Sequence, residues 1–162
     1  MDPATGNVYS TGSFTGTVTF GSTRLVSAGG NDVFVAKWDA TAGAFTSAVR
    51  GGGINAGTGT GNDQGNGIAA VSSGGTASVY VTGYFVSGTG ASIAGTALAG
   101  TSSTDLFVAR YTDAGTGLAD GGAISGGGTG ADVGNGIAAA GGAVYVGGYI
   151  VPAATFGSIG LG

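Results

Sequence analysis

The sequence predicts an all-β protein made of repeated antiparallel units, and three observations support this prediction. A short strand pattern built around Val-Tyr occurs three times along the 162 residues. Glycine accounts for 39 residues and proline for only 2, while 42% of the chain is hydrophobic, so the chain is rich in turns yet too apolar to be disordered. All 8 acidic residues are aspartate, which favours turns, whereas glutamate favours helices.

Two consecutive segments define the repeat. Residues 65–70 read Gly-Asn-Gly-Ile-Ala-Ala and precede an alternating strand at residues 78–85. The same pair returns at residues 134–139 and 143–150. The second segment alone opens the chain, at residues 8–14, so the chain is expected to begin in the middle of a repeat.

The first pass through the repeat contains several strands in order. Alternation predicts a strand at residues 8–14 and a short one at residues 17–22. A third strand at residues 32–38 and a fourth at residues 44–50 follow, and a loop rich in Gly, Thr and Asn covers residues 54–64. The third strand has two faces, formed by Phe34, Ala36 and Trp38 and by Val33, Val35 and Lys37.

The second and third passes repeat these elements. Residues 105–111 match residues 32–38, and residues 126–128 repeat the three glycines at 51–53. One unit is therefore roughly 65 to 75 residues long and has four main strands and one short extra strand. We divide the chain into a partial unit at 1–64, a full unit at 65–133 and a partial unit at 134–162.

Both faces of these strands are apolar or small, which is expected when sheets are stacked on both sides. Stacked four-stranded sheets favour a β-propeller-like array. The chain holds about two and a quarter units, whereas a closed propeller has about four to eight blades, so we expect it not to close on its own. The glycines at 12, 83 and 148 lie within strands and predict close packing, for example against an aromatic side chain of the next unit.

The motifs Gly-Asn-Val-Tyr-x-Thr-Gly, Asp-x-Phe-Val-Ala-Lys and Gly-x-Gly-Ile-Ala, in this order, resemble the bacterial β-propeller repeat called SBBP. The resemblance covers nearly the whole chain. It implies a propeller-like repeat from a large secreted or surface protein. The chain departs from the pattern at residues 141–142, which replace a longer hairpin, and at residues 92–95, which replace the Thr-Phe-Gly strand.

Asp63 and Asp132 occupy equivalent loops rich in Gly and Asn. Carboxylate, Asn and backbone oxygens suit calcium, so both residues are calcium candidates. With one carboxylate per loop, a turn-forming role is the better interpretation, and calcium remains the alternative. We otherwise expect no cofactor.

Asp32 and Asp105 each precede a strand that carries a base, Lys37 or Arg110. We interpret each acid as a cap and each base as a residue at the rim of the sheet. Since only one such acid occurs per repeat, no pair of acids is expected to converge for acid–base catalysis. The chain also lacks His and Cys, and its Gly-rich loops lack the P-loop lysine, so we expect no enzymatic activity.

The sequence therefore indicates a structural or interaction module. It predicts assembly through stacked apolar sheets and open strand edges, with copies of itself or with the rest of a longer propeller protein. The expected packing residues are Val8, Phe34, Trp38, Val79, Val81, Phe107, Tyr111, Val144 and Val146. The alternative is a glycan- or peptide-binding propeller of a secreted adhesin, because tyrosines recur in every unit.

The remaining expectations concern partners and location. The net charge is −4 and the bases are scattered, so nucleic acid is not an expected partner. No apolar run is long enough for a membrane-spanning helix, and no signal peptide is visible. The resemblance implies an extracellular or bacterial cell-surface location.

Overall fold

The structure, a computed structural model, describes residues 1–53, 61–86, 90–100, 103–156 and 159–161. Within these residues the chain forms antiparallel β-strands and no helix, and none of the sheets closes on itself. The prediction of an all-β antiparallel protein is therefore confirmed. Residues 54–60 of the predicted Gly-rich loop lie outside the described residues.

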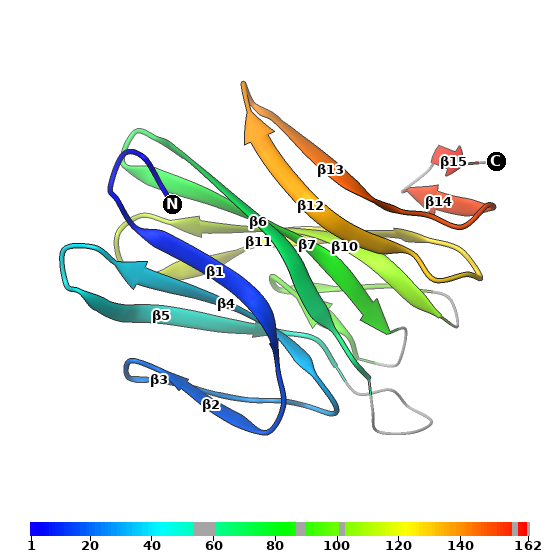
Figure 1. Ribbon diagram of the computed structural model, residues 1–162, viewed down its shortest axis with the longest axis horizontal. Helices are drawn as coiled ribbons and strands as arrows, with labels where there is room; N and C mark the ends of the chain where they lie inside the picture. Colours follow the sequence, from blue (N-terminus) through cyan, green and yellow to red (C-terminus); the bar gives the residue numbers. More distant parts are fainter. Residues whose placement is uncertain (54–60, 87–89, 101–102, 157–158, 162) are drawn as a thin grey trace.

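The N-terminal sheet has three antiparallel strands in the spatial order β1–β4–β5 (Figure 1). Its strands are β1 (Val8–Phe14), β4 (Asp32–Asp39) and β5 (Ala44–Gly51). A hairpin of β2 (Thr17–Phe20) and β3 (Thr23–Val26) separates β1 from β4 along the chain. The hairpin packs on one face of the sheet, where Leu25 lies in a small apolar cluster with Ala36 and Ala48.

The central sheet has six strands in the order β15–β14–β11–β10–β7–β6. Its main strands are β6 (Gln64–Ser73), β7 (Thr76–Val86), β10 (Thr104–Asp113) and β11 (Leu118–Gly127). The C-terminal strands β14 (Ala154–Phe156) and β15 (Ile159–Leu161) extend it beyond β11. Between β7 and β10 the chain forms a small hairpin of β8 (Ser92–Ile93) and β9 (Thr96–Ala97), and β12 (Val133–Ala140) pairs with β13 (Ala143–Tyr149) in a separate hairpin.

Two of the small hairpins pair with the end of the last main strand of the preceding unit. Ser92 of β8 exchanges two backbone hydrogen bonds with Gly52, just after β5, at 2.9 and 3.2 Å. In the same way Phe156 of β14 pairs with Gly126 of β11. The sequence predicted one short extra strand per unit, but the structure has a two-stranded hairpin at each of these places. Residues 92–95 form such a hairpin although their sequence departs from the repeat.

The main core lies between the N-terminal and central sheets. Val33 and Val35 of β4 are buried there together with Val79 and Val81 of β7. The opposite face of β4 contributes Phe34 and Ala36 to the second cluster beneath the β2–β3 hairpin. Both faces of β4 are therefore covered, which explains why the strand has apolar residues at successive positions.

The mid-strand glycines are crowded, but not by the next unit as we predicted. A side chain at Gly12 would meet the ring of Phe34 at 2.8 Å, and Phe34 lies directly opposite on the neighbouring strand of the same sheet. At Gly83 and Gly148 the crowding atoms are backbone carbonyls of Gln64 and Val133. These carbonyls lie beside register shifts between β6 and β7 and between β12 and β13, where a β-bulge brings the strands close together.

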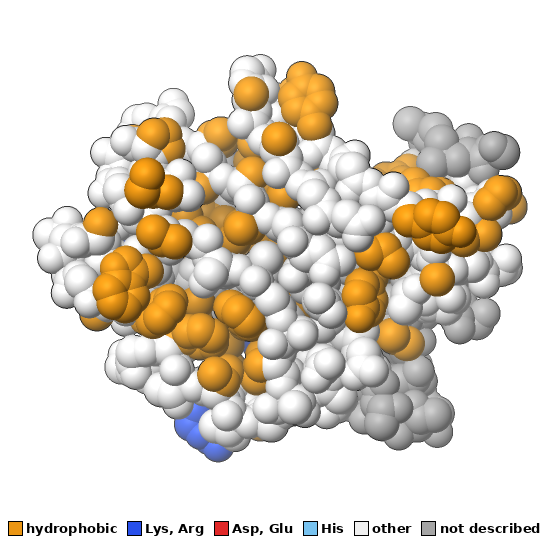
Figure 2. All heavy atoms as spheres, in the orientation of Figure 1, with side chains coloured by type: hydrophobic (Ala, Val, Ile, Leu, Met, Phe, Trp, Pro, Cys, Tyr) orange, Lys and Arg blue, Asp and Glu red, His pale blue; other side chains and the backbone are white. Residues whose placement is uncertain are grey.

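Several strands are paired on one side only within the described residues: β1 and β5 of the N-terminal sheet, β6 and β15 of the central sheet, and both strands of each separate hairpin. β1 pairs with β4, and β13 pairs with β12. Large apolar side chains are exposed at both ends of the stack: Val8 and Trp38 on the N-terminal sheet with Val26 on the β2–β3 hairpin, and Ile124, Tyr145, Val146 and Tyr149 at the other end. Figure 2 shows hydrophobic side chains gathered over the left of the molecule, where the N-terminal sheet lies. The described residues contain no helix that could span a membrane.

Candidate functional site

A buried ionic cluster joins the two large sheets. Lys37 extends from β4, and its Nζ lies 2.8 Å from Oδ2 of Asp113, at the end of β10. Both side chains are only 2% exposed. The hydroxyl of Tyr9, on β1, donates a hydrogen bond of 2.8 Å to the same carboxylate oxygen. The cluster therefore fixes the position of β10 against β1 and β4.

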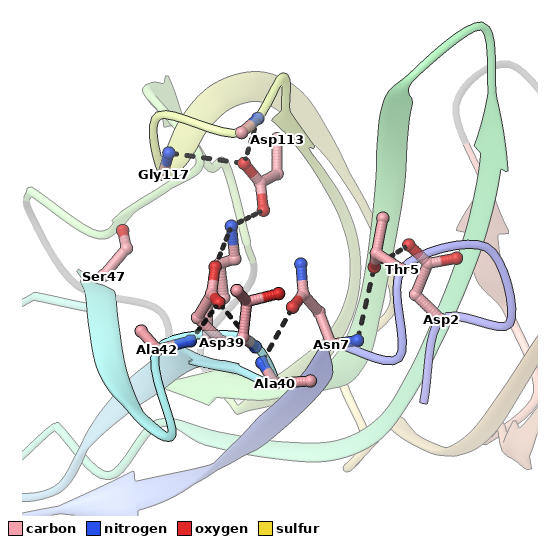
Figure 3. A network of polar contacts seen from close by, with 12 residues as sticks. Asp2, Thr5, Asn7, Asp39, Ala40, Ala42, Ser47, Asp113 and Gly117 are labelled. Carbon is pink, nitrogen blue, oxygen red and sulfur yellow. Dashed lines mark hydrogen bonds and ion pairs between the residues drawn. The ribbon is translucent and has the colours of Figure 1, made fainter.

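The turns at the ends of β4 and β10 hold the acids of this cluster (Figure 3). Oδ1 of Asp113 accepts hydrogen bonds from the backbone N–H groups of Gly115 and Gly117, at 2.8 and 3.3 Å. Asp39 caps its own turn through Thr41 and Ala42 and lies 3.5 Å from Nζ of Lys37. Two aspartates from equivalent turns thus approach one lysine.

The electrostatics of the cluster favour a charged Asp113. Burial alone would raise the pKa of Asp113, but hydrogen bonds from Lys37, Tyr9 and the turn outweigh burial and lower it. The pKa of Tyr9 is raised by burial and by its hydrogen bond to Asp113. The carboxylate therefore stays ionised and the phenol stays protonated at neutral pH.

Lys37 was predicted to lie at the rim of a sheet, and this prediction was wrong. Lys37 is buried because it lies on the same face as Val33 and Val35, the face that the central sheet covers. Asp113 and Tyr9 were missed as its partners. The signal for Lys37 was its alternation with two valines, but no sequence signal indicated which acid would face it.

Asp63 and Asp132 each join the ends of two strands. The carboxylate of Asp63 accepts backbone hydrogen bonds from Gly53, after β5, and from Val86, at the end of β7, at 3.0 and 2.9 Å. Asp132 repeats the arrangement with Gly128 and Val151, at 2.8 and 2.7 Å. Each aspartate thus ties the last strand of one unit to the second strand of the next.

The structure also brings pairs of acids together, contrary to the prediction that none would converge. Asp32 and Asp63 meet at Gly52, where a side chain would lie 2.9 Å from Oδ1 of Asp32 and 2.5 Å from Oδ2 of Asp63. Asp105 and Asp132 meet in the same way at Gly127. The prediction failed because it considered each acid only within its own strand. In the structure, the acid at the start of β4 or β10 meets the acid that directly precedes β6 or β12, the first strand of the next unit.

The Asp32–Asp63 pair is deeply buried, with 0% and 1% of the two residues exposed. Arg50 forms an ion pair with Oδ2 of Asp32, while Oδ1 of Asp32 has no hydrogen-bond partner among the residues that the structure describes. Burial raises the pKa of Asp63 to about 6. The Asp63 carboxyl therefore takes up a proton near pH 6.

Each calcium candidate has one other aspartate beside it, Asp32 for Asp63 and Asp105 for Asp132. No group of three or more His, Cys, Asp or Glu side chains gathers among the described residues. Both oxygens of the Asp63 and Asp132 carboxylates accept backbone N–H groups. This arrangement is that of acids holding turns and strand ends.

The predicted packing residues fall into two groups. Val79, Val81, Phe107 and Tyr111 are completely buried, and Phe34 is half-buried in the second cluster. The second group lies at the ends of the stack, where Val8, Trp38 and Val146 are 42%, 38% and 37% exposed and Val144 is half-buried. The first group packs inside the protein, and the second lies on its open faces.

Comparison with known proteins identifies no relative. No protein-family model, curated protein or solved structure matches the chain. The resemblance to the SBBP repeat therefore stays a prediction that rests on the three sequence motifs.

Proposed function

We propose that this chain is a non-catalytic structural module of a β-propeller-like repeat array, which assembles through stacked apolar sheets and open strand edges. Its partners are copies of itself or further repeats of a longer protein. The resemblance to SBBP repeats supports a location outside the cell or on a bacterial surface. No cofactor enters this function.

One observation carries the proposal: the N-terminal and central sheets bury an apolar core between them, whereas the apolar face of β13 is left partly open. Val146 of β13 is 37% exposed, whereas Val81, the equivalent residue of β7, is fully buried. Both valines lie opposite an isoleucine of the preceding strand, Ile137 and Ile68. An exposed apolar strand with a free edge favours association with another strand.

The molar mass of the chain in solution tests this proposal. We expect light scattering and negative-stain images over a concentration series to show self-association, reduced in the Val146→Lys variant. A charge on an open edge strand hinders pairing without reaching the core. A chain acting as part of a longer array would instead gain stability when a second copy of residues 98–133, which contains the strands missing from the partial unit at 134–162, is appended to its C-terminus. A well-ordered monomer that shows neither behaviour contradicts the proposal.

A second candidate function is glycan or peptide binding by a secreted adhesin. Tyr145 and Tyr149 favour it, because they are 63% and 61% exposed on the same strand and tyrosine rings stack on sugars and peptides. Binding on a glycan array that is lost in a Tyr145→Ala/Tyr149→Ala variant would support it. Self-association that persists in this variant would separate the two functions.

A further inference from the structure

The N-terminal and central sheets carry the same four-residue patch in the same register. On the N-terminal sheet Tyr9 lies opposite Lys37, and Val35 lies opposite Val49. On the central sheet Tyr80 lies opposite Arg110, and Val108 lies opposite Ile124. We call the first set the covered patch and the second set the open patch.

The covered patch shows what such a surface binds. β10 of the central sheet lies on it, and Phe107, Ala109 and Tyr111 pack with Tyr9 and Val35 in the main core. Asp113, at the end of β10, neutralises the cation of the patch. β6 and β7 also lie on the covered patch, and β10 and β11 complete the cover as an antiparallel hairpin whose first strand ends in an aspartate held in a turn.

The open patch has the same chemistry but is not covered in this way. Arg110 is exposed, whereas its equivalent in the covered patch, Lys37, is only 1% exposed. Ile124 is 59% exposed, whereas its equivalent, Val49, packs against the core. A groove of about 470 Å³ lies here, lined by Tyr80, Arg110 and Ile124 of the central sheet and by Val144 of β13. The groove therefore lies beside the free edge of β13, where the next strand of the third unit would pair.

Arg110 is also held in place for such a partner. Its guanidinium donates a hydrogen bond of 3.1 Å to Oγ of Ser78 on the same sheet. None of the ion pairs found among the described residues involves Arg110. A partner that supplies a carboxylate at the position of Asp113 would match this cation.

We infer that the open patch binds a β-hairpin of the β10–β11 type, in which an aspartate at the end of the first strand pairs with Arg110 while alternating apolar side chains fill the groove. This inference rests on the proposed function, because it names the partner of one of the exposed faces. The hairpin adds to the free edge of β13 and lies on the open patch as β10 lies on the covered patch.

A peptide of residues 104–127, which contains β10 and β11, tests the inference directly. We expect the dye-labelled peptide to bind the full chain in fluorescence anisotropy titrations. The Asp113→Asn peptide should bind about tenfold more weakly, and the Arg110→Asp chain should bind the unmodified peptide at least about tenfold more weakly. An Asp113→Arg peptide should recover most of the affinity for the Arg110→Asp chain, because the two charges are exchanged.

The same peptide could instead displace the protein's own β10–β11, and Lys37 distinguishes the two modes. If the peptide displaces β10–β11, the Lys37→Met substitution weakens peptide binding and the Arg110→Asp substitution does not. That result overturns the inference. Absence of binding overturns it too. Since Arg110 is exposed, we expect the Arg110→Asp chain to keep its melting temperature, so a loss of binding reports on the surface and not on folding.

Self-association separates this inference from the proposed function. If the chain self-associates and Arg110→Asp abolishes self-association while the peptide does not compete, the patch binds a second copy and not a free hairpin. If self-association is unchanged by Arg110→Asp and the peptide does not bind, the inference is wrong while the proposed function stands.

Discussion

Lys37 of the N-terminal sheet and Asp113 of the central sheet form a buried ion pair, with 2.8 Å between Nζ and Oδ2. The pair connects two sheets that share no main-chain ladder. The equivalent cation of the central sheet, Arg110, is exposed. The cation is buried between the first two sheets and exposed at the equivalent position of the central sheet. This difference is consistent with a further sheet stacking there.

Removing the lysine should destabilise the protein strongly. Lys37→Met leaves the carboxylate of Asp113 buried without its cation, and breaking a buried pair in this way costs about 3–5 kcal/mol. Urea unfolding measures the change. The matched control is Arg110→Met, which removes an exposed cation and should change the free energy of unfolding by less than about 0.5 kcal/mol. A Lys37→Met protein as stable as the Arg110→Met protein would show that the pair has no structural role.

The Asp63 carboxyl should make stability depend on pH. Its pKa is raised from 3.8 to about 6 in the folded protein, mainly by burial. Folding therefore favours its protonated form, so its stabilising contribution is complete below about pH 4 and is lost as the pH rises through 6. The free energy of unfolding should fall by up to about 3 kcal/mol between pH 4 and 7.

Asp63→Asn supplies the control for this pH dependence. Asparagine cannot ionise, and its carbonyl still accepts one of the two backbone hydrogen bonds. Urea unfolding at several pH values should then show a flatter profile between pH 4 and 7. The lowered pKa values of Asp113 and Asp39 act in the opposite sense, since their stabilisation is lost as the pH falls through these values. An unchanged slope in Asp63→Asn would mean that another group causes the effect.

Gly52 should tolerate no side chain. Its φ is +135°, and an added Cβ would lie 2.5 Å from the Asp63 carboxylate. Strain and crowding together should cost about 2 kcal/mol or more in Gly52→Ala. Gly43→Ala serves as the control, because Gly43 also has a positive φ of +62° but open space around it. Thermal unfolding should show a larger loss for Gly52→Ala, and equal losses would exclude crowding as the cause.

The strands were predictable from the sequence because alternation and turn residues are local signals. The two faces of β4 were assigned correctly, with Val33 and Val35 toward one core and Phe34 and Ala36 toward the other. The second strand of each small hairpin was not found, because strands of two to four residues are too short to show alternation.

The buried polar groups were not predictable in the same way. The contact between Lys37 and Asp113 exists only because two sheets stack face to face, and the meeting of Asp32 with Asp63 depends on how one unit follows another. The sequence indicates which residues alternate along a strand. It does not indicate which acid of another unit a buried lysine will meet, because that depends on the offset between stacked sheets.

A pair of equivalent valines tests whether the apolar face of β13 is an assembly surface. Val81 of β7 is fully buried, and Val146 of β13, in the matching register, is 37% exposed. Val81→Asp places a charge in the core, so we expect it to abolish folding. Val146→Asp should leave the circular dichroism spectrum and the melting temperature of the dilute chain nearly unchanged, because water still reaches the new carboxylate.

At high concentration the two valines should differ in another way. If the face of β13 becomes covered on assembly, Val146→Asp buries a charge only in the assembled state and should lower the average molar mass measured by light scattering. Val146→Thr, which keeps the shape without the charge, should assemble more readily than Val146→Asp. Unchanged assembly in Val146→Asp would mean that β13 stays exposed to solvent. Association would then have to use the free edge of β1 or the exposed Val8 and Trp38 of the N-terminal sheet.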